Sequence, residues 1–454
     1  MKSRPNLLNF FYLLGSGLAI HFMGTVYRIW LARKIGADGL GVFQMAYPVY
    51  RLLSGLATIG LPMAITKWVA EYLEKKEFNK INQLKIWSVK TVIITSLISS
   101  ILLFLSAPLL GKYVFADPRV KFSLLIICIA IPFSALSAIY RSYFQGFSLM
   151  APTALSEITE QISEITTACL LLMFLFPVIK LESSAIPMIG LTVGEIVCFL
   201  TVYYFNKYKH SIPINTSNIE NIPRLAIFNY AWPLLLNQIV VSISAASEAS
   251  LVPKLLISNG YTLSQSTNIF GVLNGMAAPV AFFPLIFMLP LASVLSPQVS
   301  SAAQTNLSSV FQKKIQRYYL AAICICLTGF FLIFWNARPL ALFLYGNVSS
   351  VDLIRLLVIG LPFAGIAILN LTILSAAGSS SIILMLSLWG IGLKTMLFFI
   401  LIKPLGINGA AWSITVTQIF IFLASFAKIS SIFQLDAKIH PRLPQLFRFP
   451  TVLL

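Results

Sequence analysis

Residues 91–110 read TVIITSLISSILLFLSAPLL, twenty consecutive positions without a charged side chain. A helix of about 20 apolar residues is long enough to cross the hydrocarbon core of a bilayer, so this stretch predicts a membrane-spanning helix. Similar apolar runs, separated by charges or by Gly and Pro, recur between residues 8 and 428. The chain has room for about twelve such helices. We therefore expect an all-α polytopic membrane protein.

The composition agrees with this expectation. Of 454 residues, 58% are hydrophobic and only 10% are charged, whereas a soluble chain carries about 25% charged residues. The net charge of +18 needs no nucleic-acid partner, because cytoplasmic loops of membrane proteins collect Lys and Arg. If the N-terminus is inside, the inner segments hold roughly twice as many Lys and Arg as the outer loops. This bias predicts a multi-pass protein with both termini in the cytoplasm.

Short motifs recur at a spacing of about half the chain. Leu61-Pro62-Met63-Ala64 is echoed by Leu289-Pro290-Leu291-Ala292, and Ile131-Pro132-Phe133 by Leu361-Pro362-Phe363. Repeats in transporters place the substrate site between the repeated halves. Six helices per half is an even number, so both halves would enter the membrane in the same orientation. The pattern predicts two six-helix lobes around a central cavity, related by a pseudo-two-fold axis along the membrane normal. Chance recurrence of Leu-Pro kinks is the alternative.

The expected domain boundaries follow from the same runs. We expect an N-terminal lobe over residues 1–210, a cytoplasmic linker over 211–223, a C-terminal lobe over 224–428 and a basic cytoplasmic tail over 429–454. The tail mixes cations such as Arg442 with apolar side chains. This mixture is typical of a segment that lies on anionic lipid.

Several cations lie inside the predicted helices: Arg28, Arg51, Lys67, Arg355 and Lys394. A charge near the bilayer centre costs about 2.5–3.5 kcal/mol, so such residues usually face a cavity and a partner. We expect helices over 8–32 and 41–69 joined by a short loop, which lets Arg28 and Arg51 face one lumen. Paired guanidinium groups suit a phosphate or pyrophosphate. Alternatively, either arginine snorkels to the interface.

Five acids share this apolar setting: Glu157, Glu160, Glu164, Glu195 and Glu248. The spacing of the first three, three and four residues apart, places them on one helical face. Like charges on one face repel unless they are protonated, cation-bound or paired, so Glu160 and Glu164 are candidates for proton or sodium coupling. We expect Glu157 to be solvated at the cytoplasmic interface.

Pairing between cations and acids stays open at this point. Glu248 could pair with Arg28 or Arg51 when no substrate is bound. Lys394 could pair with Glu248 or Glu195 instead.

Enzymatic motifs are missing from the sequence. It has no Walker-type loop ending in Lys and Ser/Thr, no GxSxG motif, no metal-ligand cluster and only three His. The five Cys lie in apolar runs without metal-type spacing, and we interpret them as core residues. We expect a secondary transporter that uses neither a cofactor nor a bound metal.

Residues 32–48 (ARKIGADGLGVFQMAYP) and 60–67 (GLPMAITK), with residues 143–146 (YFQG) and 150–154 (MAPTA), carry a family resemblance. They resemble the stage V sporulation protein B-like polysaccharide-type exporters of the multidrug/oligosaccharidyl-lipid/polysaccharide flippase superfamily. The resemblance implies a bacterial cell membrane and translocation of an undecaprenyl-pyrophosphate-linked saccharide, a cell-wall, spore-envelope or polysaccharide precursor, by alternating access.

By motif position, Arg28 and Arg51 match family cavity arginines proposed to hold the pyrophosphate. We add Lys67, Glu248 and Lys394 as candidate substrate contacts. The chain departs from the family in two places. We expect it to end after twelve helices, without the two further C-terminal helices that help form a groove for the lipid tail in relatives, and it has Glu164 where relatives often have a basic residue.

Two other functions compete with this interpretation. A multidrug and toxin extrusion-type cation antiporter of the same superfamily would need an acidic, aromatic cavity, whereas several of the intramembrane charges here are cations. A scaffold that recruits envelope enzymes has no need of intramembrane charges.

Overall fold

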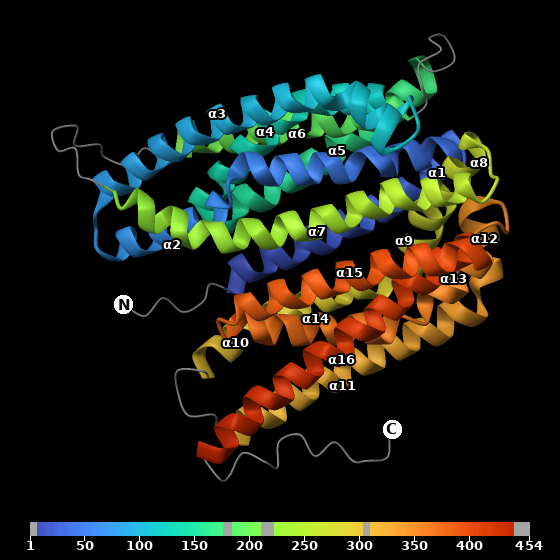
Figure 1. The fold of residues 1–454 in the computed structure, drawn as a ribbon. Coiled ribbons are helices and arrows are strands. Elements are labelled where there is room, and N and C mark those ends of the chain that lie inside the picture. Colours follow the sequence, from blue (N-terminus) through green and yellow to red (C-terminus); the bar gives the residue numbers. More distant parts are fainter. Residues whose placement is uncertain (1–6, 176–183, 210–221, 303–308, 440–454) are drawn as a thin grey trace. The chain divides into compact units, whose positions relative to one another are not determined.

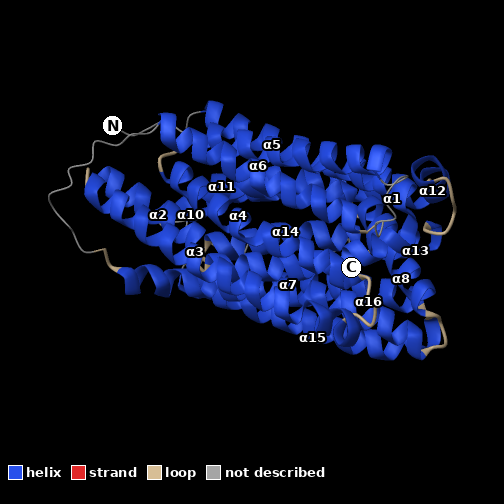
Figure 2. Ribbon diagram, turned by 90° about the horizontal axis from the view of Figure 1, so that it is seen from above, coloured by secondary structure: helices blue, strands red, loops and turns tan. Residues whose placement is uncertain are grey.

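The computed structural model describes residues 7–175, 184–209, 222–302 and 309–439, and these ranges consist of helices and their connections, without a strand (Figures 1 and 2). The all-α architecture is thereby confirmed. The N-terminal six residues, most of the expected linker and the tail from residue 440 lie outside the described residues.

The chain divides into two compact units, residues 1–276 and 277–454. The helices of the first unit are α1 (Leu7–Thr58), α2 (Leu61–Glu74), α3 (Phe78–Leu109), α4 (Val120–Gly146), α5 (Met150–Leu170), α6 (Ala185–Lys209), α7 (Arg224–Ser258) and α8 (Leu263–Gly271). Those of the second are α9 (Ala278–Ala281), α10 (Met288–Ala302), α11 (Ser309–Trp335), α12 (Ala337–Tyr345), α13 (Val351–Val358), α14 (Leu361–Ala376), α15 (Ser380–Leu405) and α16 (Ile407–Ile439). The expected lobe boundary at residues 211–223 stays a prediction.

α1 contains two arms that double back on each other (Figure 1). The loop expected over residues 34–41 is helical except at Gly36, whose φ of 71° is a left-handed conformation that favours glycine. The turn packs against α8 through two further glycines. A Cβ at Gly41 would collide with the backbone of Thr267, and one at Gly271 with the carbonyl of Ala37. The glycines of this stretch therefore serve close helix packing as well as the turn.

A charged network joins the α1 turn to the start of α4. Arg119 Nη2 lies 3.0 Å from Asp38 Oδ1 and 2.8 Å from Asp117 Oδ2, and Thr267 Oγ1 donates to Asp117 Oδ2 at 3.0 Å. Hydrogen bonds to Asp38 and Asp117 raise the pKa of Arg119, so its guanidinium stays charged. The buried Asp117 thus has its charge balanced within the first unit.

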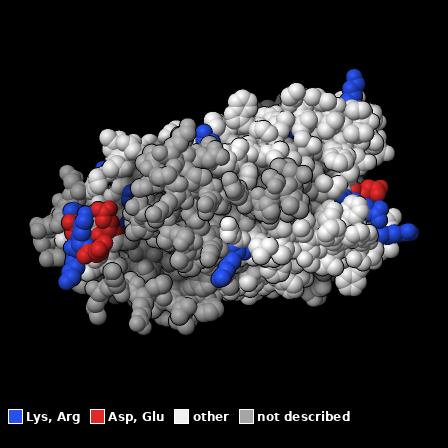
Figure 3. Space-filling model, turned by 90° about the horizontal axis from the view of Figure 1, so that it is seen from below, with Lys and Arg blue, Asp and Glu red and all other residues white. Residues whose placement is uncertain are grey.

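The exterior of the helices is suited to lipid. Large apolar side chains on α3 are exposed, including Ile101, Phe104 and Leu105, at 58%, 60% and 65%. The described atoms visible in Figure 3 are mostly uncharged, and acidic side chains appear there only in small groups beside basic ones. In water such an apolar surface would favour association with other proteins, whereas in a bilayer it contacts the lipid tails.

Among the described residues, eight helices are long and apolar enough to cross a membrane, or ten if each bent helix pair is one span. That count treats Gly15–Glu74 as one span. At 1.5 Å per residue, 60 residues make about 90 Å of helix, which is enough for two crossings of the bilayer. The count also leaves out α5, which carries three glutamates. The multi-pass character is confirmed, and the number of twelve stays a prediction.

The second unit contains a buried polar network across α11, α14 and α16. Tyr319 donates its hydroxyl hydrogen to Asn370 Oδ1 at 2.5 Å, and Asn370 Nδ2 donates to Ser425 Oγ at 2.9 Å. Asn370 and Ser425 are fully buried. The repeated Pro motifs have different local roles, since Pro132 lies inside α4 whereas Pro362 lies in the first turn of α14.

Candidate functional site

The acidic residues of α5 meet an arginine that the sequence analysis did not single out. Arg141 Nη1, on α4, lies 3.4 Å from Glu160 Oε2 and 3.8 Å from Glu157 Oε1. The Arg141 side chain is 19% exposed, and Glu157 and Glu160 are 34% and 27% exposed. Glu157 is therefore half-buried and ion-paired rather than fully solvated.

A sequence signal for Arg141 does exist. The connection between α4 and α5 spans only residues 147–149. Arg141 and Glu157 each lie about two helical turns from this connection, so a helical hairpin brings their side chains level. Counting from the turn, rather than along one helix, would have predicted this pair.

α6 approaches α5 closely because it has two glycines one turn apart. A Cβ at Gly194 would lie 2.9 Å from the carbonyl oxygen of Glu160, and one at Gly190 would lie 2.7 Å from that of Glu164. Small residues four apart permit such close contact between membrane helices. The glycines on α6 thereby bring the next turn of this helix, which carries Glu195 and Cys198, against the acidic face of α5.

Glu195 is the most buried of these carboxylates, at 6% exposure. Its Oε1 accepts a hydrogen bond from the Tyr50 hydroxyl of α1, and Tyr50 also contacts Ser134 Oγ of α4 at 2.9 Å. Among the described residues, Glu195 Oε2 has no hydrogen-bond partner. A buried carboxylate oxygen without a partner is costly, so it marks a position where a proton or a cation would be stabilised.

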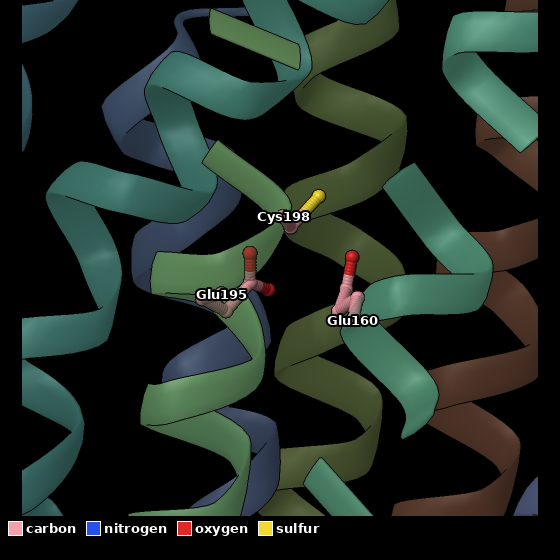
Figure 4. A group of neighbouring side chains, drawn as sticks. All are labelled: Glu160, Glu195 and Cys198. Carbon is pink, nitrogen blue, oxygen red and sulfur yellow. The ribbon is translucent and has the colours of Figure 1, made fainter. Parts of the chain in front are cut away.

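Glu160, Glu195 and Cys198 form a group that we call the α5–α6 cluster. Their ligand atoms all lie within 4.8 Å of one another. Figure 4 shows the two carboxylates on facing helices, with the sulfur of Cys198 one turn from Glu195 on α6. The sequence named Glu160 for ion coupling, and the fold adds Glu195 and Cys198 to it.

The two predicted arginines lie on different arms of α1, and both are exposed. Arg28 and Arg51 both lie within electrostatic range of the Tyr47 hydroxyl. Arg28 also lies within electrostatic range of the carboxylate of Glu164, whose Oε2 lies 3.5 Å from Gln161 Nε2.

The remaining predicted contacts belong to α2, α7 and α15. Lys67 on α2 is exposed, with Nζ 4.2 Å from the ring centroid of Tyr230 and 4.8 Å from that of Trp68, a cation–π arrangement. Glu248 is half-buried on α7. Lys394 belongs to the second unit and lies 5.9 Å from the ring of Phe398. Their roles as substrate contacts stay predictions.

Residues 7–303 match the model of the family described as polysaccharide biosynthesis protein. The chain belongs to the polysaccharide biosynthesis protein family. The match contains all helices of the first unit, including those that carry Arg28, Arg51 and the α5–α6 cluster.

Two curated relatives of this family member come from Bacillus subtilis. Stage V sporulation protein B is 27% identical over 439 residues, which are 94% of this chain and 84% of the relative. The lipid II flippase MurJ is 22% identical over 352 residues, 72% of this chain and 63% of the relative. The predicted resemblance is confirmed, and these relatives are proteins of membrane translocation and sporulation rather than enzymes.

Among solved structures, an inward-facing multidrug resistance MATE family transporter of the MOP superfamily has a TM-score of 0.74 with 14% identity. The similarity covers 93% of this chain and 99% of that one. At this identity the likeness concerns the fold. This polysaccharide biosynthesis family member therefore shares the fold of that MATE family transporter over nearly its whole length.

Proposed function

We propose that this protein is a flippase that translocates an undecaprenyl-pyrophosphate-linked saccharide across the bacterial cell membrane by alternating access. Membership of the polysaccharide biosynthesis family supports it, as do two relatives named as a sporulation protein and a lipid II flippase. In this proposal both termini are cytoplasmic, and two six-helix lobes surround a central cavity. The tail from residue 429 lies on anionic lipid.

The proposed head-group site is supported by two arginines that lie within electrostatic range of one phenol. Arg28 and Arg51 come from opposite arms of α1, yet both act on Tyr47. Two guanidinium groups present forked donors that match the oxygens of a pyrophosphate. We assign the head group to Arg28 and Arg51, and we assign supporting contacts to Lys67, Glu248 and Lys394.

Ion coupling is assigned to the acidic face of α5. Glu160 lies beside Arg141 and Glu195, and Glu164 lies near Arg28. A proton or sodium ion that neutralises this face would change the partners available to Arg28 and Arg141. Binding at Glu160 and Glu164 would thereby be coupled to release of the head group.

A second candidate function is a multidrug-type cation antiporter. The transporter fold and the carboxylates of Glu160, Glu164 and Glu195 favour it, because organic cations bind acidic cavities. The names of the sequence relatives and the exposed arginines of α1 favour the flippase.

The test is native mass spectrometry of the purified protein with undecaprenyl-pyrophosphate lipids, comparing wild type with the double variant Arg28→Ala/Arg51→Ala. We expect selective binding that the double variant loses. Arg355→Ala is a matched control, because Arg355 is also exposed on a membrane helix but lies in the second unit, over the ring of Phe334. Equal weak binding by all three proteins, with efflux of organic cations from vesicles, would assign the protein to the multidrug branch.

A further inference from the structure

We propose that the α5–α6 cluster is a binding site for a thiophilic divalent cation of the Zn²⁺ class. The site consists of Glu160 on α5 with Glu195 and Cys198 on α6, whose ligand atoms lie within 4.8 Å of one another (Figure 4). In a tetrahedral Zn²⁺ site, with ligand atoms about 2.0–2.3 Å from the ion, the ligand atoms lie about 3.3–3.8 Å from one another. Side-chain rotations that bring the three atoms about 1 Å closer together would place them on one ion.

The backbone holds this arrangement in place. Glu195 and Cys198 are three residues apart, so both project from one face of α6. A pair at this spacing on one helix, with a glutamate from a facing helix, is a way in which helix bundles build metal sites. Gly190 and Gly194 hold α6 against the backbone of α5 at the level of Glu160 and Glu164.

A second observation points to a ligand rather than to a passive acidic patch. Glu195 is 94% buried, as its exposed fraction is 6%, and its Oε2 has no hydrogen-bond partner in the part of the chain that the structure describes. Its Oε1 is held by Tyr50, which fixes the carboxylate on the cluster side of α6. In Figure 4 one oxygen of Glu195 is directed towards Glu160. A cation between the two helices would give Oε2 the partner it lacks.

The surrounding charges fit a divalent ion. Two carboxylates and a thiolate carry three negative charges, a divalent cation cancels two of them, and Arg141 beside Glu160 balances the third. Glu157, the other partner of Arg141, is 34% exposed and has access to solvent. The remaining polar groups facing the cluster are the hydroxyls of Tyr50 and Ser134 and the carboxylate of Glu164.

The thiol decides the class of cation. Mg²⁺ and Ca²⁺ prefer six or more oxygen ligands, whereas thiolates select Zn²⁺ and similar soft ions. Three protein ligands leave a fourth position for water. Glu160 is 27% exposed, and its exposed side offers an entry path for the ion.

Occupation of this site would regulate transport. This consequence rests on the proposed function, in which Glu160 couples the ion gradient to translocation. An ion that bridges α5 and α6 would keep Glu160 from exchanging its coupling ion. Micromolar Zn²⁺ is therefore expected to inhibit translocation, whereas binding itself is measured independently of any transport activity.

The test is titration of the purified full-length protein with Cd²⁺, whose bond to a thiolate produces an ultraviolet charge-transfer absorption. We expect Cd²⁺ to bind one saturable site per chain. Zn²⁺ should displace Cd²⁺ from this site, whereas millimolar Na⁺ should not. Cys198→Ser is expected to abolish the absorption. Glu195→Gln is expected to weaken Cd²⁺ binding by at least about 10–100-fold. Mutation of a residue that only hydrogen-bonds to a metal ligand already lowers metal affinity by that range. Affinity should fall at low pH, because binding displaces the thiol proton.

Cys128→Ser is the matched control, because Cys128 is also buried in the first unit but donates its thiol hydrogen to the carbonyl of Leu124 at 3.2 Å. It should bind Cd²⁺ like wild type. Size-exclusion elution and melting temperature confirm that each variant is folded. No absorption in wild type, absorption that persists in Cys198→Ser, unchanged affinity in Glu195→Gln or displacement by millimolar Na⁺ would each overturn the proposal. Loss of lipid binding with Cd²⁺ binding intact would overturn only the flippase assignment.

Discussion

Among the described residues, a buried polar group between apolar helices can be compared in each compact unit. The α5–α6 cluster in the first unit is charged, and Glu195 Oε2 in it has no hydrogen-bond partner. The network in the second unit, formed by Tyr319, Asn370 and Ser425, is neutral and linked end to end by hydrogen bonds. A closed neutral network ties helices together, whereas an open charged one has capacity left for an ion. The difference separates a structural role from a functional one.

The largest effect should come from Glu195→Gln. The amide keeps the size of the side chain and its acceptor for the Tyr50 hydroxyl, so the fold should persist, but the negative charge is lost. Glu195 lies beside Glu160, the residue proposed for ion coupling, so loss of its charge should weaken binding of the coupling ion. We expect translocation of a fluorescent undecaprenyl-pyrophosphate-linked saccharide in proteoliposomes to fall at least roughly a hundredfold, about 2.7 kcal/mol. Near-normal rates at normal abundance would show that the first unit's cluster is as structural as the second unit's network.

Arg141→Leu should destabilise the first unit, because it leaves Glu157 and Glu160 without their cation. Breaking a buried ion pair costs about 3–5 kcal/mol of stability. Because the Arg141 side chain is 19% exposed, we expect a smaller loss in the free energy of unfolding, about 2–3 kcal/mol. Unfolding in mixed detergent micelles measures it. Adding Glu160→Gln should recover part of the stability, and a double variant no more stable than the single one would contradict the charge argument.

Asn370→Ala removes both hydrogen bonds of the neutral network. Hydrogen bonds between membrane helices contribute about 0.6 kcal/mol on average and at most about 1.7 kcal/mol, so we expect a loss of about 1–2 kcal/mol. The translocation rate per folded protein should stay unchanged. A loss of translocation without a loss of stability would show that Asn370 has a functional rather than a structural role.

Ser425→Ala is the mildest change, because it removes only the last residue of the network and leaves the central Asn370 in place. Asn370 keeps its bond to Tyr319 and loses only the acceptor on α16. The expected loss in the free energy of unfolding is about 0.6 kcal/mol. A loss as large as that of Asn370→Ala would indicate that the three side chains act as one cooperative unit.

Much of this protein follows from local sequence. Uncharged runs such as residues 91–110 determine membrane helices. Apart from a closed β-barrel, only a helix satisfies its own backbone hydrogen bonds within lipid. The spacing of Glu157, Glu160 and Glu164 determines a shared face of α5 through the helical period alone. The motifs around Gly36 and Gly60 were sufficient to indicate the family.

Only the tertiary structure decided which charges meet. Arg141 joins Glu160 because α4 and α5 form a hairpin, and Glu195 and Cys198 join it because Gly190 and Gly194 let α6 approach. The fold brings Glu164 within electrostatic range of Arg28, and the pairing of Glu248 with Arg28 or Arg51 stays a prediction. Helical periodicity sets which residues share a face. It does not set which faces touch, because that depends on packing between segments distant in the chain.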